Sequence, residues 1–178
     1  MTPTDTMKRR LNLGCGRDLR PDCMNVDSVA SIGPDLIWDL DQTPYPLPAG
    51  HFEHILALDV VEHLADLREF LEEAHRLLAP GGILEITTPH FSCANSFTDP
   101  THRRHLGYFS FDYFTDRGTH NHYSTARFRI KSRILAFPTG RWIKFFAAWA
   151  NRNPARYEQR WAWIRPAWFL RFELEKAP

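Results

Sequence analysis

Residues 10–16 of this chain read Arg-Leu-Asn-Leu-Gly-Cys-Gly, a short apolar run that stops at two glycines with one residue between them. The apolar part predicts a strand over 10–13. The glycines predict a tight turn at its carboxyl end, because glycine lets the backbone turn sharply and admits a ligand without interference from a Cβ atom. Strands this short and apolar suit a parallel sheet that is covered on both faces. The stretch therefore places a candidate ligand site at one edge of an α/β sheet.

Three further short apolar segments predict strands of the same sheet, and they cover residues 24–29, 35–40 and 52–59. Between the last two, residues 43–50 carry three prolines at alternate positions. Proline removes an amide donor and excludes a helix, so this segment is predicted to be a loop.

A helix and a fifth strand follow. Asp66 can cap a helix, with Glu69 in its first turn. The apolar residues of this helix share one face, and they are Leu67, Phe70, Leu71, Ala74, Leu77 and Leu78. Residues 80–82, Pro-Gly-Gly, end the helix and turn the chain into a strand over 83–88. Strand, helix and strand in this order predict a right-handed parallel crossover.

The last part of the chain predicts two edge strands. Residues 127–131 and 169–175 alternate with a period of two, as strands with one wet face do. A short amphipathic helix between them is predicted by four aromatic residues at helical spacing, Trp142, Phe145, Phe146 and Trp149. The predicted fold class is therefore α/β: a Rossmann-like, doubly wound, mostly parallel sheet with an antiparallel C-terminal strand pair.

The 178 residues fit one domain, which we expect to span residues 1–178. The formal net charge of +1 hides an asymmetry. Residues 1–89 carry 7 Lys and Arg against 15 Asp and Glu, whereas residues 90–178 carry 15 against 6, together with 20 of the 24 aromatic residues. We interpret these parts as two halves that do different chemical work.

Composition excludes several classes of protein. The longest apolar runs, such as 145–150, are far shorter than the ~20 residues of a membrane-spanning helix, and the N-terminal residues lack the apolar core of a signal peptide. We therefore expect a cytoplasmic protein. Cysteines 15, 23 and 93 are odd in number and lack a paired short spacing, which argues against a disulfide framework and a cysteine zinc site. They are interpreted as packing residues.

The class of cofactor follows from Asp27, which ends the second predicted strand and can accept two hydrogen bonds from a ribose diol. A dinucleotide fingerprint requires a third glycine and an acid ~20 residues further on. Here Leu19 stands at the third glycine position, Pro21 interrupts the helix, and Asp27 comes only 11 residues after Gly16. These departures disfavour an NAD(P)-dependent oxidoreductase, which remains an alternative.

The ordered set of motifs resembles the class I S-adenosylmethionine-dependent methyltransferases, in particular the small bacterial proteins described as predicted methyltransferases. The residues that carry the resemblance are 11–16, 25–27, 39–40, 52–64 and 77–84, with a second block at 89–91, 99–102 and 111–114. Asp18 departs from the pattern, since many members have a third glycine there, and we interpret this as a shortened first helix. The resemblance divides the domain into a cofactor-binding half over 11–88 and a substrate-side half over 89–178 with an aromatic helical insertion.

The resemblance also implies the cofactor contacts. Gly14 and Gly16 would line the methionine moiety, and Asp27 would bind the ribose hydroxyls of S-adenosylmethionine. Asp39 and Leu40 would border the adenine, and Leu58 and Asp59 would lie near the sulfonium. The complete predicted set is Asn12, Gly14, Cys15, Gly16, Asp27, Asp39, Leu40, Leu58 and Asp59.

Methyl transfer from a sulfonium requires alignment of the reactants and, for a hydroxyl or amine acceptor, a base. His90, His102 and Asp99 are the candidate catalytic residues. The rival interpretations are a loop histidine bonded to a carbonyl and a turn built around Asp99. His63 is interpreted as a structural or cofactor-side residue. We predict no metal, although His120 and His122 could present two imidazoles together, because no carboxylate or cysteine stands at a recognised ligand spacing.

The acceptor is the least determined part of the prediction. The second half contains 12 Arg and 3 Lys, which fits recognition of an anionic group. The aromatic residues are assigned mainly to core packing, with a substrate pocket, a dimer face or a peripheral membrane contact as alternatives. We therefore predict a methyltransferase acting on a small molecule, glycan or lipid that is anionic or amphipathic, and nucleic acid is disfavoured. The alternative from another class is a catalytically degenerate, cofactor-binding regulatory subunit. No oligomeric state is predicted.

Overall fold

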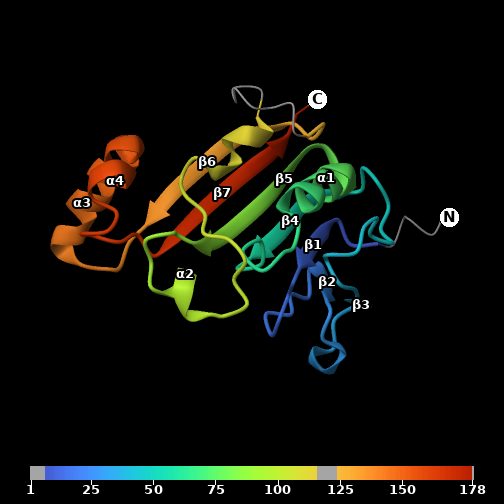
Figure 1. Ribbon diagram of the computed structural model, residues 1–178. Helices are drawn as coiled ribbons and strands as arrows, with labels where there is room; N and C mark the ends of the chain where they lie inside the picture. The colour runs from blue at the N-terminus through green and yellow to red at the C-terminus, as the bar shows by residue number, and fades with distance from the viewer. Residues whose placement is uncertain (1–6, 116–123, 178) are drawn as a thin grey trace.

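The computed structural model describes residues 7–115 and 124–177, and its centre is a seven-stranded sheet (Figure 1). The strands are β1 (Arg10–Leu13), β2 (Cys23–Asp27), β3 (Leu36–Ile37), β4 (Phe52–Leu58), β5 (Leu78–Pro89), β6 (Phe128–Ala136) and β7 (Phe169–Lys176). Their order is β3-β2-β1-β4-β5-β7-β6. Strands β1 to β5 pair in parallel, and β7 pairs antiparallel with both β5 and β6. The predicted fold class is confirmed, and both halves of the chain supply strands to one sheet.

The helices are α1 (Leu67–Leu77), α2 (Asn95–Thr98), α3 (Arg141–Arg152) and α4 (Pro154–Arg160), with 3-10 helices η2 (Ala30–Ile32) and η3 (Ser110–Phe114). Helix α1 begins as predicted, because the side chain of Asp66 accepts hydrogen bonds from the amides of Arg68 and Glu69. Its buried residues Phe70, Leu71, Ala74 and Leu77 pack into the core over one face of the sheet. None of the described helices is long and apolar enough to cross a membrane.

The opposite face of the central strands is polar, contrary to the prediction of apolar cover on both faces. There, His54 Nε2 lies 3.3 Å from Glu85 Oε2, and Arg10 lies 3.2 Å from His54 Nδ1. Residues 14–22 connect β1 to β2 by turns and contain Pro21, so the shortened first helix that the sequence predicted is absent from this connection. A segment this short cannot cross the sheet and cover its second face.

The sheet reverses its strand order between β1 and β4, where β1 is followed along the chain by β2 on one side and β4 lies on the other. Ligands bind at such switch points, in the crevice outside the carboxyl ends of the strands. Leu13 is level with Val26 of β2 and with Ala57 of β4, so the segments that follow these strands leave the sheet together. This edge, called the carboxyl edge below, is where the candidate site lies.

Candidate active site

Gly14 occupies the switch point and has no substitute there. Its φ of +63° is a conformation that favours glycine, and a Cβ atom added to it would lie 2.5 Å from Val60 Cγ2, just after β4. Gly16, with a φ of +51°, ends the same turn. The turn thus has no side chain at Gly14 and Gly16, where β1 and β4 diverge, as the sequence predicted.

Asp27 anchors this turn from the carboxyl end of β2. One carboxylate oxygen accepts a hydrogen bond from the amide of Gly16 at 2.8 Å, and the other accepts one from the amide of Val29 at 2.9 Å. Each oxygen of a carboxylate has two acceptor positions, so one remains on each oxygen. The carboxylate therefore lies beside the glycine turn with capacity for two hydroxyl groups.

Two members of the predicted cofactor set support the turn from behind. Asn12 is 2% exposed and donates hydrogen bonds to the carbonyl of Asp18 and to Asn25 Oδ1. The thiol of Cys15 is buried, and burial raises its pKa. The side chain of Asn12 thus holds the turn in place, and the contacts of Asn12 and Cys15 with the cofactor stay predictions.

Asp39 and Leu40 follow β3 at the same edge. Ile37 pairs with Asp27, so Asp39 stands two residues beyond the level of the Asp27 carboxylate. The loop is held by Tyr45, whose hydroxyl donates to the carbonyl of Leu40 at 2.8 Å. Asp41 ties it to the segment after β4, because its carboxylate accepts a hydrogen bond from the amide of Ala65 at 2.7 Å.

Asp59 directly follows Leu58, the last residue of β4, and carries the one positive φ among the described non-glycine residues, +56°. Its amide donates to the carbonyl of Thr87, and its carboxylate accepts from the hydroxyl of Thr87 at 3.1 Å. Left-handed backbone at a residue other than glycine costs free energy and is concentrated at functional sites. The bend turns the chain away from the sheet at the switch point.

A cavity of about 510 Å³ opens beside Asp59 at the carboxyl edge, and we call it the edge pocket. Its lining comes from the ends of β4 and β5, from α2 and its flanks, and from the first residue of β7. The lining residues are Asp59, Glu62, His63, Pro89, Asn95, Thr98, Asp99, Pro100, His102 and Phe169. One residue of the predicted cofactor set, Asp59, therefore lines the same cavity as two predicted catalytic residues, Asp99 and His102.

Glu62 and His63 stand in the edge pocket with His102, and the three can each offer one atom within 4.8 Å of the others. Glu62 is 2% exposed, and burial raises the pKa of its carboxyl to about 7. The sequence prediction omitted Glu62 as a site residue, although Glu62 and His63 immediately follow the strand that ends at the switch point. His120 and His122, the histidine pair weighed in the sequence, lie outside the described residues.

Asp99 accepts two hydrogen bonds from Thr101, from the amide at 2.8 Å and from the hydroxyl at 2.6 Å. These bonds lower the pKa of the exposed Asp99 carboxyl, first through the hydroxyl. A carboxylate with a lowered pKa is a poor proton acceptor, so the predicted role of Asp99 as a base is not supported. Thr101 also bonds His63 Nδ1 at 2.8 Å, and Asp99 thus supports His63 through Thr101.

His90 is fully buried, and this removes it from the candidates for a general base, contrary to the sequence prediction. Its Nδ1 accepts a hydrogen bond from the amide of Ser92, and its Nε2 lies 3.2 Å from Glu158 Oε1 in α4. Glu158 also accepts from the amide of Tyr108. The ring joins the end of β5 to the helical insertion and is not among the residues that line the edge pocket.

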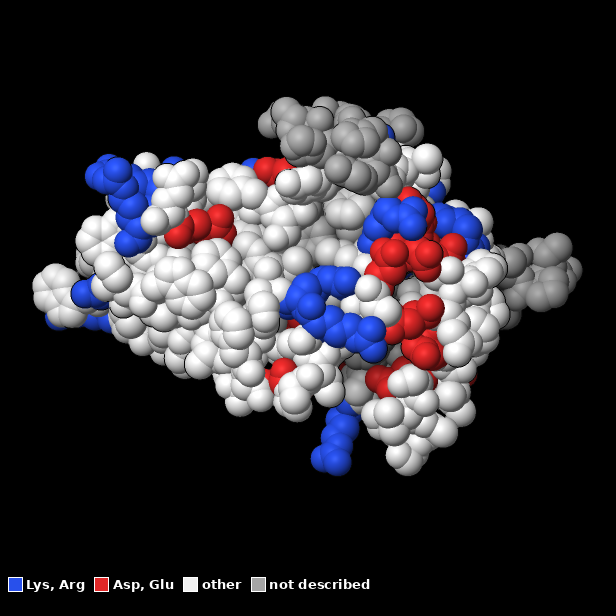
Figure 2. All heavy atoms as spheres, viewed as in Figure 1, with Lys and Arg blue, Asp and Glu red and all other residues white. Residues whose placement is uncertain are grey.

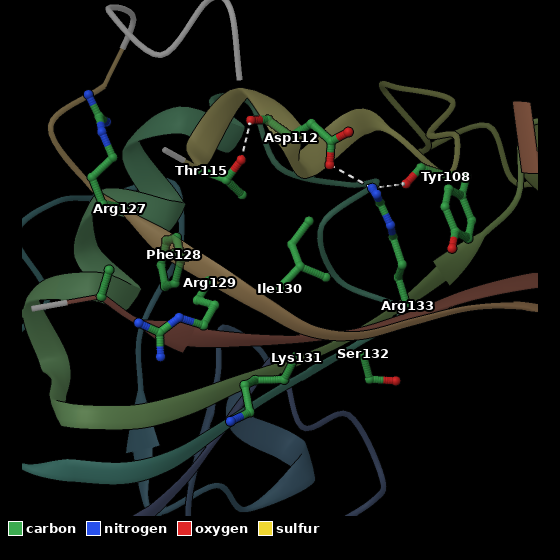
Figure 3. Close-up of a pocket in the computed structure, with 11 residues that line it drawn as sticks. Tyr108, Asp112, Thr115, Arg127, Phe128, Arg129, Ile130, Lys131, Ser132 and Arg133 are labelled. Carbon is green, nitrogen blue, oxygen red and sulfur yellow. Dashed lines mark hydrogen bonds and ion pairs between the residues drawn. The ribbon is translucent and has the colours of Figure 1, made fainter. Parts of the chain in front are cut away.

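A second cavity, of about 700 Å³, lies against β6 and η3 (Figure 3). Arg129 of β6 is level with Glu175 of β7, which is level with Ile83 in the middle of β5, so this part of the cavity lies away from the carboxyl edge. Its cations have partners: Arg133 lies 2.6 Å from Asp112, and Arg129 lies 3.1 Å from Glu175. The arginines of this cavity are therefore paired and stand apart from the edge pocket, and recognition of an anionic group by the second half stays a prediction.

The helical insertion with α3 and α4 lies at the carboxyl edge, beyond the ends of β6 and β7 (Figure 1). Several of its large apolar side chains are exposed. Figure 2 shows a broad uncharged surface there, with Lys and Arg side chains at its outer end. We use the name aromatic face for the exposed large apolar residues of the insertion and the segment after it, which are Trp142, Phe145, Trp161, Trp163, Ile164 and Trp168. Trp142 is 79% exposed and Phe145 is 73% exposed, so the predicted assignment of these rings to core packing is wrong. Phe146 and Trp149 do pack against the core.

Comparison with known proteins identifies the relatives of this chain. Residues 4–149 match the family described as "Methyltransferase domain". Ubiquinone biosynthesis O-methyltransferase of Caulobacter sp. (strain K31) is 50% identical over 40 residues, which are 22% of this chain and only 16% of that relative.

Solved structures share the fold at low sequence identity. A SAM-dependent methyltransferase from Archaeoglobus fulgidus superimposes with a TM-score of 0.61 and 16% identity, over 96% of this chain and 87% of that one. The N-methyltransferase NodS from Bradyrhizobium japonicum WM9, in complex with S-adenosyl-L-homocysteine, superimposes with a TM-score of 0.54 and 16% identity, over 95% and 78%.

Proposed function

This chain belongs to the methyltransferase-domain family, and on that premise we propose that it transfers the methyl group of S-adenosylmethionine to an acceptor bound in the edge pocket. The observation that carries the proposal is that Asp59 lines the edge pocket and is also one of the predicted cofactor-binding residues, at the switch point. Cofactor and acceptor sites that share this residue would place the methyl group and the acceptor side by side.

The residues at the carboxyl edge fit the cofactor. Gly14 and Gly16 leave the backbone open to the methionine portion, and Asp27 has acceptor positions for both ribose hydroxyls. The bound cofactor would supply a methyl group that is already activated as a sulfonium. The chain's own residues then have to align the acceptor with that methyl group and exclude competing water.

We propose an oxygen as the acceptor atom, in an amphipathic molecule. The likeness of 40 residues to an O-methyltransferase supports oxygen. The aromatic face supports an apolar portion, because Trp168 adjoins Phe169 of the edge pocket and Trp163 lies 5.4 Å from the ring of Phe91, next to His90. A hydroxyl must lose its proton on methylation. Glu62 and His102 line the edge pocket, in which the hydroxyl would be bound when it loses that proton.

Calorimetric titration with S-adenosylmethionine and S-adenosylhomocysteine tests the proposal. We expect one cofactor per chain and at least tenfold weaker binding by Asp27→Asn, which keeps the size of the side chain but loses one acceptor oxygen. Asp22→Asn is the matched control, because its exposed carboxylate pairs with Arg10 before β2, far from the turn, and it should bind normally. Absence of binding by the wild-type chain would contradict the proposal, and binding without turnover on any extract would favour a regulatory subunit.

A further inference from the structure

The edge pocket contains a buried carboxylate without a partner. Glu62 is 2% exposed, and neither of its carboxylate oxygens takes part in a hydrogen bond. Its main chain is fixed, because its carbonyl accepts from the amide of Arg103 at 2.8 Å. Burying an unpaired polar group costs free energy, and such groups in folded proteins are normally satisfied by a partner, a water or an ion. The side chain lines the edge pocket and is therefore aimed at whatever the pocket binds.

The two neighbouring histidines also present lone pairs. Thr101 donates its single hydroxyl proton to Asp99, so it accepts a hydrogen bond from His63 Nδ1, and the free lone pair of a neutral His63 is then on Nε2. His102 Nδ1 lies 3.2 Å from the carbonyl of Ser96, which only accepts, so the lone pair of a neutral His102 is also on Nε2. That atom lies 4.0 Å from Glu62 Oε1.

When Glu62 is ionised and both histidines are neutral, the three side chains of the cluster present acceptor atoms to one another, and none of them donates to another. The hydroxyl of Thr88 is a donor beside Glu62, on the side of β5. A separation of 4.0 Å is too long for a hydrogen bond between Glu62 and His102. Ligands that lie ~2.1 Å from one tetrahedral ion are ~3.4 Å from each other, so donor atoms within 4.8 Å reach that spacing by small side-chain rotations. We propose that Glu62, His63 and His102 bind one divalent first-row transition-metal ion in the edge pocket.

The donor set selects the kind of ion. Two imidazoles and one carboxylate suit zinc, manganese or ferrous iron, whereas magnesium and calcium prefer oxygen ligands throughout. The outer contacts also follow the pattern of protein metal sites, in which a ligating histidine donates its other nitrogen to a carbonyl or a hydrogen-bonded oxygen. Ser96 provides this contact for His102, and Thr101, itself held by Asp99, provides it for His63.

The ion would act on the acceptor, so this inference rests on the proposed function. Three protein ligands leave coordination positions open toward the pocket, where an acceptor hydroxyl can bind and lose its proton to solvent more readily. In the transfer step the oxygen lone pair forms the new C–O bond. The C–S bond breaks, and its electron pair returns to sulfur, which leaves as the neutral thioether. The metal neither gains nor loses electrons.

The test uses the full chain, stripped of metal, titrated with Mn²⁺ and separately with Zn²⁺ by calorimetry, with Mn²⁺ electron paramagnetic resonance as a second measurement. We expect one ion per chain in the wild type and at least 30-fold weaker binding in Glu62→Gln, His63→Ala and His102→Ala. The matched control is Asn95→Ala, which changes a polar residue of the same pocket outside the cluster and should bind normally. Circular dichroism confirms that each variant is folded.

Binding of S-adenosylhomocysteine is measured on the same samples. If S-adenosylhomocysteine binds and neither ion does, the metal site is overturned while the proposed function stands. The same holds if the three variants bind ions as the wild type does. If the ions bind as expected and the product does not, the proposed function fails and the site remains.

Discussion

Gly14 is the residue on which the geometry of the turn depends most directly. A side chain there meets two separate obstacles, the positive φ and the contact with Val60. We expect Gly14→Ala to lower the free energy of unfolding by about 2–4 kcal/mol and to weaken cofactor binding more than tenfold. Gly50→Ala separates the obstacles, because Gly50 has a φ of +66° with open space around it, and should cost only about 1 kcal/mol. Denaturant unfolding measures both, and equal losses would show that the Val60 contact is unimportant.

At the same scale, the candidate catalytic residues show why residue type alone is a weak guide. His90 and His102 both follow strand β5 along the chain, yet one is buried against Glu158 and the other lines the edge pocket. A histidine can serve as a base, a ligand or a structural contact, and its neighbours decide which. These neighbours come from distant segments: Glu158 lies 68 residues from His90.

Among the elements, α3 differs most from its prediction. Its aromatic spacing correctly indicated an amphipathic helix, but Trp142 and Phe145 face outward. Exposed aromatic rings beside Arg141 and Lys144 are typical of a surface that contacts an anionic lipid headgroup region. We propose that α3 and the aromatic face bring the chain to its amphipathic acceptor at such a surface.

Vesicle sedimentation tests this role of α3. We expect the chain to sediment with vesicles that contain phosphatidylglycerol, less so at high salt, because added salt screens the basic side chains. Replacing Trp142 and Phe145 together by serine should reduce the bound fraction at least fivefold. Ile37→Ser is the control, since Ile37 is also exposed but lies in β3, far from α3 along the sheet. A wild-type chain that stays in the supernatant would contradict the proposal.

In the whole molecule, the acidic and basic halves meet where α1 packs near β6. His75 of α1 lies edge-on to the ring of Phe128, 5.2 Å between centroids. Burial lowers the pKa of His75, and the cationic Lys176 of the second half lowers it further, whereas a hydrogen bond to the backbone of Arg127 opposes part of this shift. Below about pH 6.5 the unfolded chain therefore binds a proton that the folded chain resists.

This contact makes stability depend on pH. The contribution of a neutral His75 is complete above about pH 6.5 and is lost as the pH falls through the lowered pKa, so acid reduces the free energy of unfolding. We expect the loss of stability between pH 8 and pH 5 to be smaller in His75→Phe than in the wild type, measured by denaturant unfolding at both pH values. An identical loss in the two proteins would show that another group governs the effect.

Much of the fold followed from local pattern, because each strand and α1 carry their own periodicity and turn residues. The meeting of Gly14, Asp27 and Asp59 at one edge followed too, since each stands at or just after the end of a parallel strand, and such ends lie at the same edge. The polar second face of the sheet could not be predicted from the sequence. Short apolar strands do not reveal whether the segments that connect them are long enough to cover both faces of the sheet.

The sequence by itself determined the α/β order, the glycine turn and the family to which the chain belongs. Only the tertiary structure decided which groups line the edge pocket. Thr101 lies 38 residues from His63, and the two are brought together because the segment after β5 folds back over the loop after β4, held by bonds from Arg103 and Arg104 to backbone carbonyls there. Periodicity records local spacing, whereas a binding cluster is assembled by contacts between segments that share no local pattern.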